Sequence, residues 1–203
     1  IGSFFENTSK DKNRKNEDTE SKEHKSKTID IDVKNLIPLN VSFELGTEKH
    51  DTEGRMITVD FPLFSMANLY VPNSGQKLDR LSYRTDEWDK DLLKYMKEKM
   101  KERNVPVIWL GDLNVAHTNK DTWNDGAKHL AKSAGTTSEE RASFEEQLES
   151  GFVDAFRCLH PEAMGQYTYW SQRAGNREPN KGLRLDYFIC SEDLLNDSSN
   201  EKV

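Results

Sequence analysis

The stretch VPVIWLGDLNVAH (residues 105–117) decides the fold, because it joins an apolar strand to a polar loop. Its first six residues are apolar without alternation, which predicts a strand buried inside a layered domain. Because side chains of a strand repeat with a period of two, Asp112 and Asn114 are expected to point to the same side. Asp and Asn after a strand also form turns. The stretch alone therefore leaves catalysis and turn formation open.

Hydrophobic periodicity elsewhere predicts strands interspersed with helices. Alternating or apolar runs predict strands over 39–45, 54–61, 64–71, 167–170 and 183–190. Apolar residues at helical spacing predict a helix from Ser82 that ends before Val105. The run TSEE from Thr137 has the capping-box pattern and predicts the start of a second helix. These elements indicate an α/β layered domain.

Bulk composition limits the class of protein. The 203 residues suffice for one domain, and the net charge of −7 disfavours nucleic acid as a partner. A local basic groove can nevertheless coexist with an acidic total, and a metal site needs carboxylates. Two cysteines, Cys158 and Cys190, are too few for a disulfide framework. No apolar run is long enough to span a membrane, so a membrane is not expected as a partner.

The N-terminal part has a different composition. Residues 7–28 mix charges of both signs with Ser, Thr and Asn and contain no apolar residue, so residues 1–35 are expected to be a disordered low-complexity insertion. A basic arm for nucleic acid is the alternative, which the mixed signs disfavour. The chain starts at Ile1 rather than Met and stops at Val203 after a polar stretch, so residues 36–203 are expected to be the ordered part of a fragment.

Four short stretches bring polar groups to strand ends, where a sheet holds them rigidly. They are LYVPN (69–73), GDLNVAH (111–117), YTYW (167–170) and GLRLDYF (182–188), and they supply Tyr70, Asn73, Asp112, Asn114, His117 and Asp186. Carboxylates can accept a proton or hold Mg²⁺, and amide and phenol groups can donate to a phosphoryl oxygen. The set therefore suits phosphodiester chemistry.

Structural alternatives exist for each of these residues. From its residue type alone, Tyr70 is better interpreted as a core tyrosine with a satisfied hydroxyl, and His117 is better interpreted as structural than as catalytic. Asp186 lies in an otherwise apolar strand, so its carboxylate should have a partner, for which histidine is the common choice.

In this order and at these intervals, the stretches closely resemble the exonuclease III branch of the endonuclease/exonuclease/phosphatase superfamily. That branch contains the major apurinic/apyrimidinic endonucleases. HDTEGRMITVDF (50–61) and YRTDEWDKDLLKYM (83–96) also match it, and the resemblance covers about residues 39–195.

The resemblance implies a four-layered α/β sandwich, in which two mixed sheets pack face to face between helices. It implies Mg²⁺-dependent hydrolysis, with Mn²⁺ as a substitute, of the phosphodiester 5′ to an abasic site in duplex DNA. A minor 3′-exonuclease or 3′-phosphodiesterase activity, a monomer, and a location in the nucleus, or else in the mitochondrion or another organelle, are also expected.

The resemblance also implies roles for individual residues. Asp112 would be the general base, Asn114 would orient the attacking water, and both would be metal ligands. Tyr70 and Asn73 would contact the scissile phosphate, and Asp186 would orient a catalytic histidine.

Seven further residues are expected to bind DNA. Gln76, Lys77 and Arg80 would face the duplex, and Tyr169, Trp170 and Leu183 would wall the pocket for the extruded sugar. Arg184 would either contact a phosphate or pair within the fold.

The chain departs from the family pattern at several points. It lacks the N-terminal metal-binding glutamate and the C-terminal Ser-Asp-His run, so the resemblance implies that residues 36–203 are the C-terminal part of the family's catalytic domain. This chain alone is therefore expected to be inactive. Leu183 stands where many eukaryotic members have tryptophan, and Gln76 where some have arginine. A degenerate, non-catalytic module that binds DNA or protein is therefore the alternative function.

Overall fold

The computed structural model describes residues 32–195, which belong to a single unit. Residues 1–31 of the expected insertion lie outside this range, so that prediction is untested for them. The described chain begins with the exposed 3₁₀ turn η1 (Val33–Leu36), so regular structure starts within the last residues of the expected insertion.

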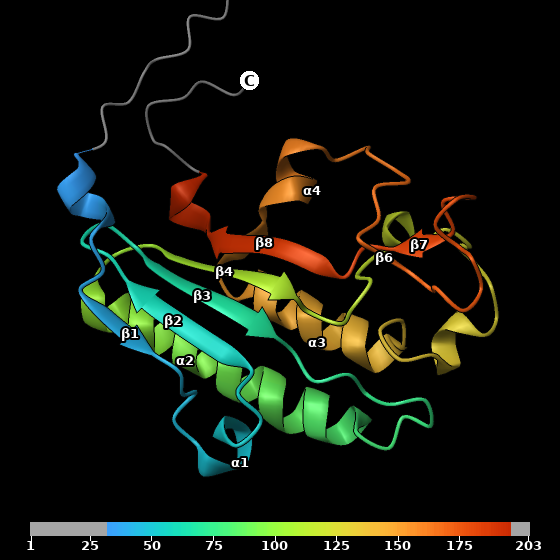
Figure 1. The fold of residues 1–203 in the computed structure, drawn as a ribbon, viewed down its shortest axis with the longest axis horizontal. Coiled ribbons are helices and arrows are strands. Elements are labelled where there is room, and N and C mark those ends of the chain that lie inside the picture. The colour runs from blue at the N-terminus through green and yellow to red at the C-terminus, as the bar shows by residue number, and fades with distance from the viewer. Residues whose placement is uncertain (1–31, 196–203) are drawn as a thin grey trace, which may run out of the picture. The chain divides into compact units, whose positions relative to one another are not determined.

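A six-stranded mixed sheet forms the centre of the described unit (Figure 1). Its strands, in spatial order, are β1 (Asn40–Ser42), β2 (Met56–Asp60), β3 (Ser65–Tyr70), β4 (Val107–Asp112), β8 (Asp186–Ser191) and β5 (Phe152–Asp154). Only β3 and β4 run parallel, and the other neighbours are antiparallel. A separate hairpin pairs β6 (Tyr169–Trp170) with β7 (Gly182–Leu183).

Two long helices, α2 (Asp89–Arg103) and α3 (Ser138–Glu149), lie side by side against one face of this sheet (Figure 1). The core there contains Trp109 of β4 and Ile189 of β8, packed with Leu92 of α2 and Phe144 of α3. A π-helical stretch (Tyr83–Trp88) precedes α2. The shorter elements are α1 (Glu48–Asp51), α4 (Ala155–Leu159) and 3₁₀ turns at Asn119–Asp121, Leu130–Lys132 and Glu192–Leu194.

The opposite face of the sheet carries exposed apolar side chains. Val41, Ile57, Tyr70 and Phe188 each expose between 42% and 55% of their surface. The mixed α/β fold class is thus confirmed, and residues 32–195 supply one large sheet of the expected sandwich with its helical layer. None of the helices in these residues combines the length and apolar character needed to cross a membrane.

The structure corrects two details of the element prediction. Residues 183–190 do not form one strand, since β7 ends at Leu183 and β8 begins at Asp186. Strand β5 and helix α4 were not predicted, because elements of three and five residues are too short to show a period.

The capping box at the start of α3 is confirmed. The Thr137 hydroxyl accepts a hydrogen bond from the Glu140 backbone N–H at 3.2 Å, and Glu140 Oε2 accepts one from the Thr137 N–H at 3.1 Å. We expect Thr137→Ala to lower the free energy of unfolding by about 1 kcal/mol, because the Glu140 N–H loses its acceptor. Chemical denaturation would measure it. Ser138 is the exposed neighbour of Thr137, so Ser138→Ala is the control. If Ser138→Ala destabilised the protein as much as Thr137→Ala, Thr137 would not be the capping residue.

Candidate active site

Tyr70, Asp112 and Asp186 lie in one row across the end of the sheet. Strand pairing places Tyr70 opposite Asp112 and Asp112 opposite Asp186. Paired residues of neighbouring strands project to the same face, so the three side chains are neighbours. Asp186 and Tyr70 are exposed and Asp112 is half-buried. The structure thus brings together three of the predicted catalytic residues, with Tyr70 on the surface rather than in the core.

Gly111 allows the strands to meet closely just before this row. Its φ of 124° lies in the region that favours glycine. A side-chain carbon there would collide with the Leu69 carbonyl oxygen of the neighbouring strand. The glycine therefore fixes how β4 delivers Asp112 beside β3.

The carboxyl group of Asp112 has a raised pKa. Burial raises its pKa above the ordinary value, and the nearby charge of Asp186 raises it further, while the N–H of Asn114 acts in the opposite direction. A carboxylate with a raised pKa holds a proton more readily, which suits a general base.

Asn114 corrects the argument from strand period. Strand β4 ends at Asp112, and Asn114 has a left-handed backbone with φ 49°, so the two side chains do not alternate along one strand. The Asn114 N–H donates to Asp112 Oδ1 at 2.9 Å, which is the turn interaction that the sequence left open. Its own amide nitrogen donates to the Val71 carbonyl at 2.9 Å.

The YVPN loop is joined to the GDLN loop through their asparagines. Asn73 Nδ2 donates to Asn114 Oδ1 at 3.0 Å, and Asn73 Oδ1 accepts from the Gly75 N–H at 2.9 Å. Asn73 is exposed and Asn114 is buried. Because an amide NH₂ has two donors, Asn73 keeps one N–H directed to solvent or a ligand.

Asp186 differs from expectation in its surroundings. It is the first residue of β8 and is exposed, and no residue among 32–195 forms a hydrogen bond to its carboxylate. The premise of a buried carboxylate that needs a partner was therefore wrong. Its backbone N–H donates to the Thr168 hydroxyl at 3.0 Å, a contact that sequence reasoning missed.

His117 has a structural environment, as its pattern indicated. Its ring contacts Glu145 at 2.5 Å and meets Phe144 edge-on at 5.0 Å. Its backbone N–H donates to the Tyr187 hydroxyl, which in turn donates to the Val115 carbonyl at 2.7 Å. Tyr187 therefore anchors the loop that follows Asp112, and sequence reasoning missed this role.

Several predicted DNA-binding residues border one cleft. A cleft of about 1010 Å³ lies between Gln76 and residues 168–178, and its lining includes Tyr169 and Trp170. Leu183 and Tyr169 both line a second cleft of about 360 Å³. Thr168, whose hydroxyl accepts a hydrogen bond from the backbone N–H of Asp186, also lines the larger cleft. One wall of this cleft therefore contacts the first residue of β8, although Tyr70, Asp112 and Asp186 are not among its lining residues.

Lys77 and Arg80 lie on the loop next to the cleft-lining Gln76. Lys77 is exposed, whereas Arg80 is half-buried and pairs with Glu53 at 2.7 Å. The Arg80 guanidinium also stacks over the Tyr83 ring at 5.0 Å. Lys77 is free to meet a polyanion, whereas Arg80 already has a carboxylate partner.

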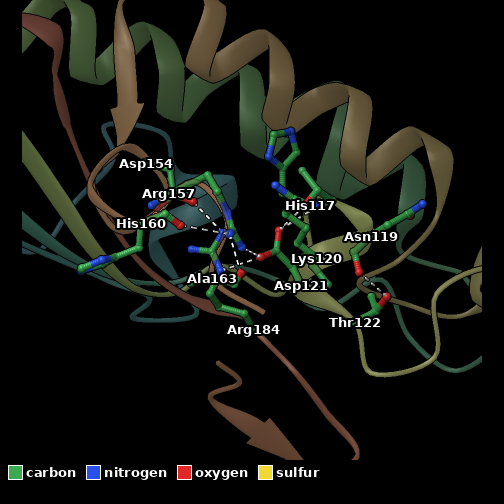
Figure 2. Close-up of polar contacts among 12 residues, drawn as sticks. His117, Asn119, Lys120, Asp121, Thr122, Asp154, Arg157, His160, Ala163 and Arg184 are labelled. Atoms are coloured by element: carbon green, nitrogen blue, oxygen red, sulfur yellow. Dashed lines mark hydrogen bonds and ion pairs between the residues drawn. The ribbon is translucent and has the colours of Figure 1, made fainter. Parts of the chain in front are cut away.

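Arg184 pairs within the fold. It is buried, and its guanidinium donates to Asp121 at 2.8 Å and to Asp154 at 2.6 Å (Figure 2). It also lies 4.2 Å from the centre of the Tyr187 ring. Of the two alternatives expected for Arg184, the structure supports pairing within the fold, because its side chain is enclosed and its charge is already paired.

The carboxylate row suits a hard divalent cation. Mg²⁺ is commonly held by one or two carboxylates together with water and substrate phosphate oxygens. Asp112 and Asp186 provide such a pair at an exposed edge. Within residues 32–195 no three His, Cys, Asp or Glu side chains gather as a larger metal-binding group. The role of Asn114 as a metal ligand stays a prediction, because its amide oxygen already accepts a hydrogen bond from Asn73.

This edge, with its carboxylate row and asparagine pair, agrees with the family that the motifs suggested. The chain belongs to the endonuclease/exonuclease/phosphatase family, whose sequence model matches residues 24–200. The resemblance to its exonuclease III branch is confirmed by individual relatives.

Three relatives illustrate the similarity. A DNA-(apurinic or apyrimidinic site) endonuclease of Dictyostelium discoideum is 48% identical over 159 residues, which are 78% of this chain and 43% of that protein. An exodeoxyribonuclease of Bacillus subtilis is 45% identical over 157 residues, 77% of this chain and 60% of that protein. The crystal structure of an AP endonuclease from Leishmania major is 35% identical, with a TM-score of 0.68, and covers 79% of this chain and 55% of that one. The chain thus spans about half the length of the relatives it matches.

Proposed function

We propose that this chain is part of a DNA repair endonuclease that hydrolyses the phosphodiester 5′ to an abasic site in duplex DNA. The observation that carries the proposal is the row of Tyr70, Asp112 and Asp186 at the end of the sheet. The names of the relatives from Dictyostelium and Leishmania support this substrate. The name of the Bacillus relative supports a minor exonuclease activity, which we propose acts at 3′ ends as a 3′-exonuclease or 3′-phosphodiesterase.

The residues divide the chemistry among them. Asp112, half-buried at the end of β4, takes the proton from the attacking water. Tyr70 donates its exposed hydroxyl, and Asn73 its remaining N–H, to the oxygens of the scissile phosphate. Asn114 acts through Asn73, whose amide it holds at 3.0 Å.

The carboxylates of Asp112 and Asp186 would hold Mg²⁺, or Mn²⁺ in its place. A bound divalent cation would supply a positive charge that stabilises the developing negative charge on the phosphoryl oxygens. Two carboxylates in register at the exposed edge fit that requirement.

Duplex DNA would lie along the larger cleft. Its lining includes Gln76, Tyr169 and Trp170. Two exposed arginines of the loop between β6 and β7, Arg173 and Arg177, line it as well. Glu178 is the one acidic residue among the lining side chains, so the cleft is locally basic although the chain as a whole carries a formal net charge of −7. Tyr169 exposes 49% of its surface and offers a ring against which an extruded sugar can pack.

Cleavage of a defined duplex tests the proposal. The substrate carries one abasic-site analogue, and the matched control is the same duplex with a normal nucleotide. We expect the full-length protein with Mg²⁺ to make one cut 5′ to the lesion, to leave a 3′-hydroxyl that a polymerase extends, and to stop when EDTA is added. A folded protein that binds the duplex without cutting it would favour the non-catalytic binding module instead.

Three expectations from the sequence remain proposals. The 203-residue chain assayed alone should cut far more slowly than the full-length protein. The protein should act as a monomer. Its proposed location is the nucleus, with the mitochondrion or another organelle as the alternative.

A further inference from the structure

We propose that Arg84 is a positioning residue for the cleavage reaction, because its guanidinium joins the YVPN loop to the GDLN loop. The inference rests on the proposed function, and it concerns a residue to which the sequence patterns assigned no role. Arg84 lies in the π-helical stretch before α2 and exposes only 2% of its surface.

The guanidinium of Arg84 donates to backbone carbonyls of both loops. It reaches the Leu113 carbonyl at 2.7 Å, the Asn114 carbonyl at 2.8 Å and the Pro72 carbonyl at 3.4 Å. Pro72 immediately precedes Asn73, and Leu113 immediately follows Asp112. The contacts thus hold the two backbone segments that carry the proposed base and the phosphate-binding amide.

Two buried carboxylates hold the guanidinium in place. Asp89 lies 3.4 Å from it and also accepts a hydrogen bond from Ser143 at 2.8 Å. Glu140 lies 4.0 Å away and accepts a hydrogen bond from Ser74 of the YVPN loop region at 2.5 Å. The arginine is therefore fixed from α2 and α3, which are the rigid layer beneath the sheet.

An arginine is required here for a geometric reason. Its planar fork presents several donors in fixed directions, whereas a lysine ammonium is a compact point charge. A lysine at this position can keep the charge and one carbonyl contact, but it cannot hold both loops at once. The asparagine bridge from Asn73 to Asn114 would then lose its fixed spacing.

The expected consequence is a change in turnover more than in binding. Misplacement of catalytic groups by a fraction of an ångström to 1 Å costs up to about 10²-fold in rate, so Arg84→Lys should lower kcat for abasic-site cleavage about 10- to 100-fold. KM should change little, because the cleft residues that bind DNA lie outside these contacts.

Arg141→Lys is the matched control. Arg141 also binds a loop carbonyl, that of Ala116 at 3.0 Å, but its other partner is Asn119, and it has no hydrogen bond to the YVPN loop. Both variants are measured in the full-length protein for kcat, KM and unfolding. An Arg84→Lys protein whose kcat matches that of Arg141→Lys would overturn the inference, while cleavage by the wild type would leave the proposed function standing.

Amide hydrogen exchange gives a readout that does not depend on activity. The Val71 N–H donates to the Asp112 carbonyl at 2.9 Å, and the Asn114 N–H to Asp112 Oδ1 at 2.9 Å. We expect Arg84→Lys to speed exchange at these two amides relative to Ala67 in the buried core of β3, and Arg141→Lys to leave them unchanged. Unchanged exchange at both amides would overturn the inference even if the wild type does not cut DNA. If Arg84→Lys does not fold, Arg84→Gln replaces it in both measurements.

Discussion

Asp112→Asn is expected to lower kcat for cleavage 5′ to an abasic site by about 10³-fold, within the range that a general base contributes. The substitution keeps the size of the side chain and its oxygen for the Asn114 N–H. It removes the negative charge that accepts the proton of water and that would bind a cation together with Asp186. The full-length protein with Mg²⁺, assayed under single-turnover conditions on duplex with one abasic analogue, measures the effect.

The control must separate this loss from a general change in charge or fold. Asp125 is an exposed carboxylate on a loop away from the row, and Asp125→Asn should leave kcat at the wild-type level. Binding of the abasic duplex by Asp112→Asn, measured without cleavage, should persist because the cleft is intact. Cleavage by Asp112→Asn at a rate close to that of Asp125→Asn would remove Asp112 from the chemistry and with it the proposed mechanism.

The sequence predicted much of this site because strand ends are readable from patterns. The apolar run before Gly111 located β4, and the alternation of 64–71 located β3, so Tyr70 and Asp112 could be expected at one edge. Asp186 was expected at the same edge as Asp112, but its antiparallel pairing opposite Asp112 is a long-range contact that no local pattern specifies.

The failures have physical causes in particular residues. The period-two argument failed at Asn114, because a left-handed residue ends the strand pattern and nothing in the letter sequence marks its φ of 49°. The sequence could not decide whether Arg184 contacts a phosphate or pairs within the fold, because the carboxylates that bind it are distant in sequence. The role of Arg84 was readable in part. It stands one turn before the buried series Trp88, Leu92 and Met96, where a charged residue signals an internal partner.

Asp121→Asn is expected to lower the free energy of unfolding by about 3 kcal/mol, because it leaves buried guanidinium groups without their shared carboxylate. Asp121 is fully buried, and its Oδ1 accepts from Arg184 at 2.8 Å and from Arg157 at 2.7 Å (Figure 2). Oδ2 accepts from the N–H and hydroxyl of Thr118. The network joins the loop after GDLNVAH to α4 and to the segment between β7 and β8. Denaturant unfolding followed by tryptophan fluorescence measures the loss.

The effect of this substitution should depend on pH in a defined direction. Burial alone would raise the pKa of Asp121, but the hydrogen bond and the charge of Arg184 lower it below the ordinary value. A carboxyl group whose pKa is lowered by folding stabilises the folded state fully above the pKa of the unfolded chain, about 3.9. The difference in stability between wild type and Asp121→Asn should therefore be constant near neutrality and shrink as the pH falls below about 4.

A nearby exposed ion pair provides the comparison. Lys120 and Glu162 lie 2.9 Å apart on the surface, and Glu162→Gln should change the free energy of unfolding by less than about 0.5 kcal/mol, since water screens an exposed pair. Both pairs connect residues 118–122 to the segment that follows β5, so they differ chiefly in burial. If Asp121→Asn and Glu162→Gln proved equally mild, the buried network would not hold these segments, and the loop that follows the proposed catalytic residues would be fixed by other contacts.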